Sequence, residues 1–405
     1  MTPTSTENCR SYPRPSEGYD FIGDVHGCAT TLYKLLDSLG YEPLYSQSGQ
    51  KYYQYRLGRG RRMAVFVGDL IDRGPRIVEA VSCVKAMMEN GCAVCLLGNH
   101  ELHAILYATQ LSSTPLTKNI KSKGASEKDA IDGGVGDPNV AHQTIVSADH
   151  SRTLQPVMNA DIASYDISEE QEFLVRHSKR RAAVIEQTLT QYQQHELKKD
   201  SHCAKGVDDT LWAEHLEWFR SLPIWLENPD CRAVHACWHD SYVRLYKNYY
   251  QSELLTDRAL VDMADYTSVA YRAIDTLTRG IQLTLPNGVS MPSEFGGARK
   301  KFRTRFWDTG VRLLADLSLQ PDPLPSELST IEVSDVQRSQ LVDYPSDSPL
   351  LFIGHYWLNG DPSPLKDNII CLDYSAVKGG SLVAYRHHFN EPFDSKHFVV
   401  QANIE

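Results

Sequence analysis

Short apolar runs that end in polar residues recur along the first part of the chain. Runs at 19–23, 63–68 and 92–97 have the length and composition of buried strands. Between them, 29–39 and 76–89 carry apolar side chains at helical spacing. This alternation of strands and helices predicts an α/β fold with mostly parallel strands. In such a sheet, ligands bind at the carboxyl ends of the strands, which is where polar residues cluster in this chain.

The pattern changes in the middle of the chain. Residues 109–160 are rich in Ser, Thr, Lys, Gly and Asp, which predicts a long loop or a partly disordered insertion. The charged segment 168–197 and the amphipathic segment 210–221 predict helices. We therefore expect three parts: a flexible N-terminal arm (1–17), an inserted loop and helical cap (105–221), and a core built from 18–104 and 222–405.

Apolar runs return after the predicted insertion. Runs at 224–227, 232–236 and 350–354 predict further strands, and alternating residues near the C-terminus predict a β-rich end. Residues 238–280 predict helices. The proline- and aspartate-rich segment 320–349 predicts a linker.

Net charge, cysteine content and the lengths of the apolar runs limit the kinds of partner and compartment that we expect for this protein. The 405-residue chain has a formal net charge of −10, which opposes long-range attraction to nucleic acid or to an anionic membrane. Its nine cysteines are odd in number and irregularly spaced, which favours free thiols in a reducing compartment. Residues 1–17 lack the apolar core of a signal peptide, and no run reaches the roughly 18 apolar residues of a spanning helix. We expect a cytoplasmic protein.

The stretch Val65–Pro75, VFVGDLIDRGP, concentrates charge at the end of a buried strand. Two carboxylates, Asp69 and Asp72, and the guanidinium of Arg73 follow the apolar run within a few residues. Such charges are costly at the mouth of a strand unless a cation and an anion lie between them. A metal ion and a phosphate would fill these two roles.

Polar residues of the kinds that bind metal ions follow other apolar runs in the same way. Together with Asp69 they are Asp24, His26, Asn99, His235 and His355. Carboxylates, imidazoles and an amide oxygen form the mixed ligand set of divalent metals. We expect Asp24 and His26 to point the same way, because they lie two apart in an extended backbone. Asp69 could bridge two ions about 3.5–4 Å apart.

A single histidine at a strand end usually has a structural role. Three sequence motifs that occur in a fixed order are much more specific evidence for a shared function. GDVHG, GDLIDRGP and GNHE resemble the signature of the calcineurin-like metallophosphoesterases, in particular the branch of Ser/Thr phosphoprotein phosphatases and bacterial bis(5′-nucleosyl)-tetraphosphatases. AVHACW around His235 and FIGHYW around His355 are similar to the family's later blocks. The resemblance implies an α/β fold, the metallophosphoesterase αββα sandwich of two mixed sheets flanked by helices. It is strong over 19–103, 222–240 and 350–386 and moderate over 268–289.

The resemblance also implies a role for each matched residue. One metal would be held by Asp24, His26 and Asp69, and the other by Asp69, Asn99, His235 and His355. His100 would be the general acid, with Asp72 fixing its tautomer. Arg73 would clamp the phosphate, with Asn99 also facing the substrate.

A second phosphate-binding arginine is expected from the family. Arg279, in a stretch similar to the tetraphosphatases, is our choice. Arg303 and Arg305 are alternatives, although an ordinary basic surface explains those two better.

The resulting hypothesis is hydrolysis of a phosphate ester or anhydride by direct attack of a hydroxide that bridges two divalent metal ions. Manganese is our first choice of metal, with iron, zinc, cobalt and magnesium as alternatives. The segments GNHELH and TRG…LPNG favour an enzyme like the bis(5′-nucleosyl)-tetraphosphatases. A Ser/Thr or Tyr phosphoprotein phosphatase and a non-catalytic metal-binding regulatory module are the alternatives. The expected partner is a phosphorylated small molecule, nucleotide or phosphoprotein, without nucleic acid or membrane; the oligomeric state stays open.

Overall fold

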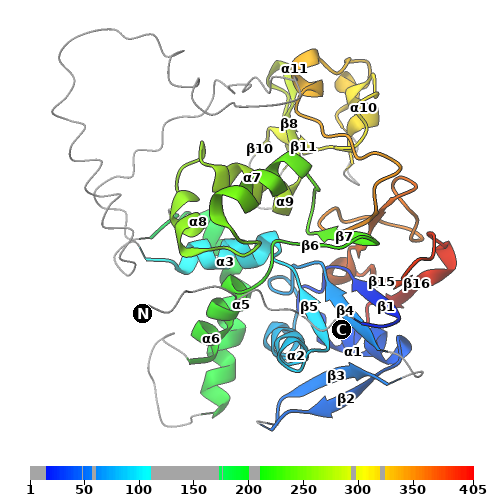
Figure 1. The fold of residues 1–405 in the computed structure, drawn as a ribbon. Coiled ribbons are helices and arrows are strands. Elements are labelled where there is room, and N and C mark those ends of the chain that lie inside the picture. The colour runs from blue at the N-terminus through cyan, green and yellow to red at the C-terminus, as the bar shows by residue number, and fades with distance from the viewer. Residues whose placement is uncertain are drawn as a thin grey trace, which may run out of the picture.

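The computed structural model describes residues 15–47, 49–56, 61–110, 173–175, 177–199, 210–292, 298–319 and 324–405. Two mixed sheets form the centre of this part of the chain (Figure 1). In the first sheet, β1, β4 and β5 are parallel, and β15 runs antiparallel to β1. Its strands are β14 (Asp373–Tyr374), β15 (Ser381–His388), β1 (Gly18–Ile22), β4 (Arg62–Phe66) and β5 (Ala93–Cys95), with β16 (Phe398–Ala402) on β15.

The second sheet is built mostly from the later part of the chain. Its strands are, in order, β13 (Ile369–Cys371), β12 (Leu350–Ile353), β7 (Cys231–Val234) and β6 (Trp225–Glu227). The first three are parallel, and β6 is antiparallel to β7. The short apolar runs of the sequence therefore form strands as predicted, and the two mixed sheets confirm the predicted fold class.

The core between the sheets follows from the period-two pattern of the strands. Met63 and Val65 of β4 are buried in the same cluster as residues of the second sheet, whereas Ala64 and Phe66 belong to the cluster with the helices. The rings of Phe21 and Phe352 stack across the interface with centroids 3.8 Å apart. Both faces of β4 are thus buried, and its polar C-terminal loop lies at the edge of the sheet.

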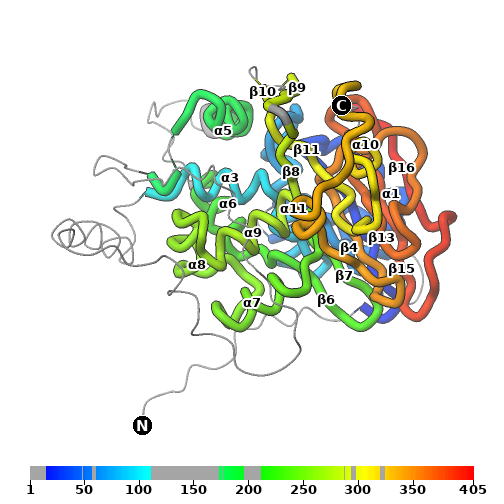
Figure 2. The backbone as a smooth tube through the Cα atoms, turned by 90° about the horizontal axis from the view of Figure 1, so that it is seen from above, coloured from blue at the N-terminus to red at the C-terminus, as the bar shows by residue number. Residues whose placement is uncertain are grey.

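Helices cover the outer faces of the sheets. Helices α1 (Ala29–Ser38) and α2 (Ile77–Glu89) confirm the predicted spacing, and their apolar faces pack against the first sheet. A hairpin of β2 (Tyr41–Tyr45) and β3 (Lys51–Tyr55) lies against α2. Figure 2 shows a group of helices on one side of the two sheets. These are α3 (Asn99–Ala108), α6 (Thr210–Arg220), α7 (Asp240–Tyr250), α8 (Asp257–Asp262) and α9 (Val269–Arg279).

The predicted insertion is described only in part. Helix α5 (Lys179–Lys199) packs on α2, and α6 packs on α3 (Figure 1). Residues 111–172 and most of the predicted N-terminal arm, 1–14, lie outside the described residues. The division into arm, core and cap therefore remains a prediction.

The linker predicted at 320–349 is wrong for the residues that are described. Leu328, Val333 and Leu341 are buried in a third apolar cluster with Leu283 and Phe302. The linker prediction failed because these apolar residues are widely spaced among prolines and aspartates and show no period. The predicted linker contains η2 (Ser326–Leu328) and α11 (Asp335–Arg338), and the segment before it contains β8 (Gln282–Thr284), η1 (Pro286–Gly288), β9 (Met291–Pro292), β10 (Ala298–Arg299), β11 (Lys301–Arg303) and α10 (Leu314–Leu317).

Two short 3₁₀ turns complete the C-terminal region, η3 (Ala376–Lys378) and η4 (Ser395–His397). Within the ranges given above, no helix combines the length and the apolar character needed to cross a membrane.

Candidate active site

The polar residues predicted as ligands gather where strands of both sheets end. Asp24 and His26 follow β1, Asp69 follows β4, and Asn99 follows β5. From the second sheet, His235 follows β7 and His355 follows β12. Segments more than three hundred residues apart in the sequence meet here, since the backbone N–H of His355 donates to Asp24 Oδ2 at 3.1 Å.

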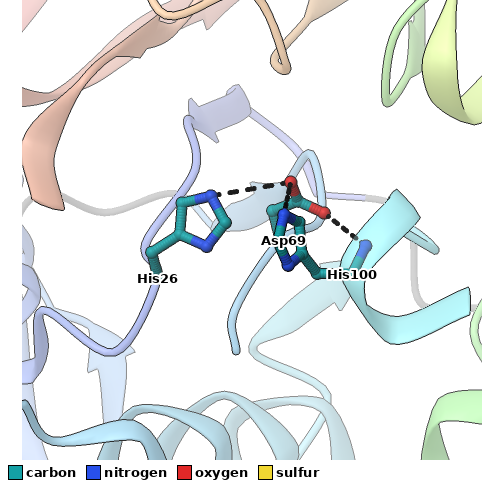
Figure 3. Close-up of side chains that lie close together, drawn as sticks. All are labelled: His26, Asp69 and His100. Carbon is teal, nitrogen blue, oxygen red and sulfur yellow. Dashed lines mark hydrogen bonds and ion pairs between the residues drawn. The ribbon is translucent and has the colours of Figure 1, made fainter. Parts of the chain in front are cut away.

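Asp69 stands at the centre of this site. Its Oδ2 atom lies 3.6 Å from Nε2 of His26, 3.9 Å from Nε2 of His100 and 3.3 Å from Nε2 of His235. Figure 3 shows the side chains of His26 and His100 both directed at the carboxylate of Asp69. Two groups in this site have ligand atoms within 4.8 Å of one another: His26, Asp69 and His100, and Asp69, His235 and His355. One carboxylate thus belongs to both groups.

Asn99 contacts both histidines of the second group, His235 and His355. Its Oδ1 atom lies 3.2 Å from Nε2 of His235 and 2.7 Å from Nδ1 of His355. Nε2 of His355 is buried and has no hydrogen-bond partner among the described residues. The structure therefore brings all of the predicted ligands into one site.

Backbone carbonyls orient two of the histidines. Nδ1 of His26 lies 2.7 Å from the carbonyl oxygen of Ile71, and Nδ1 of His235 lies 2.8 Å from that of Val67. Because a carbonyl oxygen only accepts, each Nδ1 carries a proton, and each Nε2 lies on the side of the ring that faces Asp69. That is the tautomer a metal-binding imidazole needs.

Burial and neighbouring charges set the protonation of the site. Burial lowers the pKa of His26 well below its usual value, and Arg73 and His100 add to the effect. Burial likewise lowers the pKa of His355, with Arg303 contributing. Both imidazoles are therefore neutral, as metal ligands must be.

The pKa values of the buried carboxyl groups Asp24 and Asp69 are also shifted by burial and by neighbouring charges. Burial raises the pKa of Asp24 well above its usual range, and the nearby Asp373 and Asp69 raise it further. Burial alone would also raise the pKa of Asp69, but His235 and His100 outweigh it and hold that pKa well below its usual value. Crowded buried carboxylates beside neutral imidazoles fit divalent cations, which would relieve the repulsion between them.

The predicted extended geometry of Asp24 and His26 is wrong. His26 has a left-handed backbone with φ of 43°, because the loop after β1 folds back on the loop after β4. The backbone N–H of His26 donates to the carbonyl of Asp69 at 2.9 Å, and that of Gly27 donates to Leu70 at 2.8 Å. Pairing between the two loops, not strand geometry, brings Asp24 and His26 to one site.

Glu101 holds the loop that carries Asp69. Asp69, Asp72 and Arg73 have φ of 53°, 66° and 69°, a left-handed conformation that side chains other than glycine rarely adopt. The buried carboxylate of Glu101 accepts backbone N–H groups at 2.7 to 3.3 Å, those of Gly98, Asp69, Leu70 and Ile71. The sequence analysis gave Glu101 no role, although its place in the GNHE block is a signal that could have found it.

His100 and Asp72 form the pair that the resemblance implied. Nδ1 of His100 lies 2.5 Å from Oδ2 of Asp72, and both side chains are buried. The opposite side of the Asp72 carboxylate accepts the hydroxyl of Thr188, on α5, at 2.5 Å. Thr188 was not predicted, because nothing in the sequence indicates which side of α5 faces the site.

Three cationic side chains surround Trp357 beside the metal-ligand groups. The charged groups of Arg73, Arg303 and Lys378 lie 4.3, 5.3 and 3.5 Å from the centre of the indole ring. Arg303 Nη1 also donates to the carbonyl of His355 at 2.6 Å, and burial lowers the pKa of Arg303. The interpretation of Arg303 as ordinary basic surface is therefore wrong, whereas Arg305 is exposed as expected. Neither Trp357 nor Lys378 was singled out from the sequence.

Arg279 lies at the end of α9 rather than among the ligands. Its guanidinium pairs with Asp275 at 2.9 Å one turn earlier in the helix. It is close enough to His103 to help lower the pKa of that buried imidazole to about 4, although burial is the larger cause. Its role toward a substrate stays a prediction.

Two relatives match part of this chain in sequence. An asymmetrical bis(5′-nucleosyl)-tetraphosphatase of Halalkalibacterium halodurans is 44% identical over 82 residues, which cover 20% of this chain and 30% of that protein. A symmetrical bis(5′-nucleosyl)-tetraphosphatase of Actinobacillus succinogenes is 32% identical over 100 residues, covering 25% of this chain and 30% of that protein. The match thus spans less than a third of either relative.

A solved structure and a family model extend the comparison. The cold-active protein-tyrosine phosphatase of a Shewanella species is 14% identical, covers 95% of this chain and 80% of its own, and has a TM-score of 0.38. The family model described as calcineurin-like phosphoesterase matches residues 19–266, more than half of the chain. Since that range begins at β1 and includes the first three blocks and His235, the chain belongs to the calcineurin-like phosphoesterase family, a family of hydrolases.

Proposed function

We propose that this chain hydrolyses a phosphate ester or anhydride at a centre that holds two divalent metal ions. The observation that carries the proposal is the sharing of Asp69 between two groups of possible ligands. A carboxylate shared in this way is the usual bridge of a two-metal site. The family membership supports the same reaction class.

The ligand assignment follows the two groups. The first ion would be held by Asp24, His26 and Asp69, and the second by Asp69, Asn99, His235 and His355. The mixture of imidazole and oxygen ligands suits manganese, our first choice, and also iron, zinc or cobalt, with magnesium a further alternative. When bound, the two ions would polarise the phosphoryl oxygens and supply a water that loses its proton near neutral pH.

His100 is placed to act as the general acid. Asp72 holds the proton on Nδ1, so Nε2 faces the centre of the site beside Asp69. A proton on Nε2 can pass to the departing oxygen of the substrate as its bond to phosphorus breaks. Because Asp72 holds the imidazole through Nδ1, the two residues would act as a unit.

Arg73 would bind the phosphoryl oxygens. Its guanidinium stands at the edge of the site and can donate two parallel hydrogen bonds to a phosphate. Asn99 faces the same centre, and Arg279 is the predicted second arginine. Arg303 is a second candidate, because it donates directly to the carbonyl of the predicted ligand His355. Arg279 instead pairs with Asp275.

We favour a nucleotide substrate, a dinucleoside polyphosphate, because the relatives with matching blocks are named as tetraphosphatases. The cations around Trp357 would suit a substrate that carries several negative charges. A phosphoprotein phosphatase is the alternative within the same chemistry. A non-catalytic metal-binding module is the alternative from another class.

The deciding experiment combines metal analysis with a substrate panel. We expect two divalent ions per chain and release of nucleotides from diadenosine tetraphosphate, where ADP alone indicates symmetrical cleavage and AMP with ATP indicates asymmetrical cleavage. Faster release of phosphate from a phosphoserine or phosphotyrosine peptide would favour the phosphoprotein alternative. Full metal loading without hydrolysis of any phosphate ester or anhydride in the panel would overturn the proposal in favour of the non-catalytic module.

A further inference from the structure

Helix α5 reaches from the segment predicted as an insertion into the loop that carries Asp72 and Arg73. Thr188, in the middle of this helix, is fully buried, although most residues on either side of it are exposed or half-buried. Its hydroxyl accepts the backbone N–H of Asp72 at 3.0 Å and donates to Oδ1 of the same residue at 2.5 Å. One side chain therefore fixes both the backbone and the carboxylate of Asp72.

Two glutamines on α5 extend this contact along the loop. Nε2 of Gln187 and Nε2 of Gln191 both donate to the carbonyl of Gly74, at 2.9 and 2.7 Å. Oε1 of Gln191 accepts the backbone N–H of Ile77, the first residue of α2, at 2.7 Å. The helix thus supplies hydrogen-bond partners to three backbone groups of this segment, the N–H of Asp72, the carbonyl of Gly74 and the N–H of Ile77.

The loop needs external partners because its backbone is strained. Asp72 and Arg73 both have a left-handed conformation, which persists only where surrounding contacts fix it. Glu101 fixes the first half of the loop, up to Ile71. Within the described residues, the side-chain hydrogen bonds to the backbone of the second half come from α5, beginning with Thr188.

The contact continues to the general acid. The hydroxyl of Thr188 donates to Oδ1 of Asp72, which leaves Oδ2 of that carboxylate to accept Nδ1–H of His100 at 2.5 Å. A carboxylate with both oxygens engaged has one orientation, and so has the imidazole that it holds. Nε2 of His100 then points toward Asp69.

We propose that Thr188 is a positioning residue for proton transfer: through Asp72 it fixes the orientation of His100 toward the leaving group. This inference rests on the proposed function and deepens it. Through this one side chain, α5 would support the pair of Asp72 and His100.

The test compares Thr188→Val, which keeps the shape and removes the hydroxyl, with Thr188→Ser, which keeps the hydroxyl. Thr190→Val is the matched control, since Thr190 is exposed on the same helix and donates only to the carbonyl of Glu186, one turn earlier. Each protein is loaded with manganese and assayed on phenyl phosphate, a poor leaving group, and on 2,4-dinitrophenyl phosphate, a good one.

We expect Thr188→Val to lower kcat about tenfold on phenyl phosphate and less than about twofold on dinitrophenyl phosphate, with KM unchanged. Thr188→Ser should restore kcat on phenyl phosphate to within about threefold, because it restores the bond to Asp72. Thr190→Val should match the unmodified protein. An equal loss on both substrates, or no loss on either, would overturn the proposal.

A measurement that does not depend on activity completes the test. In metal-free, 15N-labelled protein, the Nδ1 proton of His100 should give a low-field resonance that shifts or broadens in Thr188→Val and not in Thr190→Val. An unchanged resonance would contradict the inference even if turnover fell. If the unmodified, loaded protein hydrolyses neither these esters nor diadenosine tetraphosphate, the proposed function fails; if it is active and Thr188→Val behaves like it, only this inference fails.

Discussion

Nη1 of Arg73 lies 2.7 Å from Nε2 of His26. The guanidinium therefore occupies the position beside Nε2 that a metal ion bound by this nitrogen would need. A guanidinium and a divalent cation repel each other at such a distance. If His26 held an ion, Arg73 would have to turn away from Nε2, and its donors would then be free for an anion in the same site.

Arg73→Met tests this relationship. We expect the variant to retain two metal ions per chain, because Arg73 is not a ligand, and to bind the first ion at least as tightly. Its kcat/KM should fall by roughly a hundredfold or more, because the charge that develops on the phosphoryl oxygens loses a donor. Metal content by mass spectrometry and steady-state kinetics are the two measurements. Loss of one ion in this variant would mean that Arg73 holds the site together instead of competing with the metal.

Asp69→Asn should affect both ions at once. The carboxylate lies in both ligand groups, so its neutral amide weakens both. We expect metal content to fall well below two per chain and turnover to drop by roughly a thousandfold or more. The exposed Asp347→Asn serves as the control of equal charge change. Near-normal activity in Asp69→Asn would contradict the proposal that Asp69 bridges two metal ions.

Gly98→Ala should disturb the site by crowding it. A Cβ atom at Gly98 would lie 2.3 Å from both N and Oδ1 of Asp69 and 2.5 Å from Oε2 of Glu101. Since the neighbours include backbone, we expect a loss of about 1 to 3 kcal/mol in the free energy of unfolding and reduced metal binding. Gly310→Ala is the matched control, because no atom lies within 4 Å of its Cβ position. Chemical unfolding and metal analysis would check both, and equal stability of the two variants would contradict the expected crowding.

The sequence predicts those site residues that follow directly after a strand. Each ligand follows directly after a short apolar run, so the sequence signal for the strand is also the signal for the residue at its end. Parallel pairing of β1, β4 and β5 then brings Asp24, Asp69 and Asn99 to one edge. Where this simple rule gave the wrong geometry, at His26, the cause was pairing between two loops, which no periodicity encodes.

The rest of the site depends on contacts between distant segments. Thr188 meets Asp72 across 116 positions of sequence, and its helix carries a mixed, mostly polar pattern that does not indicate its buried side. Arg303 lies in a run of basic residues whose composition is that of a surface. Its approach to His355 and Trp357 is set by the way the third apolar cluster packs, which the linker prediction had missed.

His100→Asn separates acid catalysis from metal binding. We expect kcat to fall by roughly a hundredfold or more on substrates with poor leaving groups, because their oxygen departs only with a proton. On an acidic phenol the loss should be below about tenfold, since that oxygen leaves as an anion. Metal content should stay at two ions per chain. Equal losses on both kinds of substrate would exclude the acid role of His100.

Acid should weaken the packing of α5 on α6 through His215. This imidazole is buried, and Tyr192 lies against its Nδ1 atom at 2.5 Å. Burial lowers its pKa to about 4, and Lys85 and His195 also lower it, whereas Glu214 opposes them. In the unfolded chain the same group titrates near its usual value of about 6.5, so between these values the unfolded state binds more protons than the folded state.

Stability is therefore full above about pH 6.5 and declines as the pH falls toward 4, by up to about 3 kcal/mol from this one group. Urea unfolding of metal-free protein at several pH values would measure the decline. His215→Gln removes the titrating group, so the slope of unfolding free energy against pH should fall by close to one proton within that window. A slope identical to that of the unmodified protein would show that the imidazole of His215 accepts a proton as readily in the folded state as in the unfolded one. Acid would then have no means of loosening α5 through this contact.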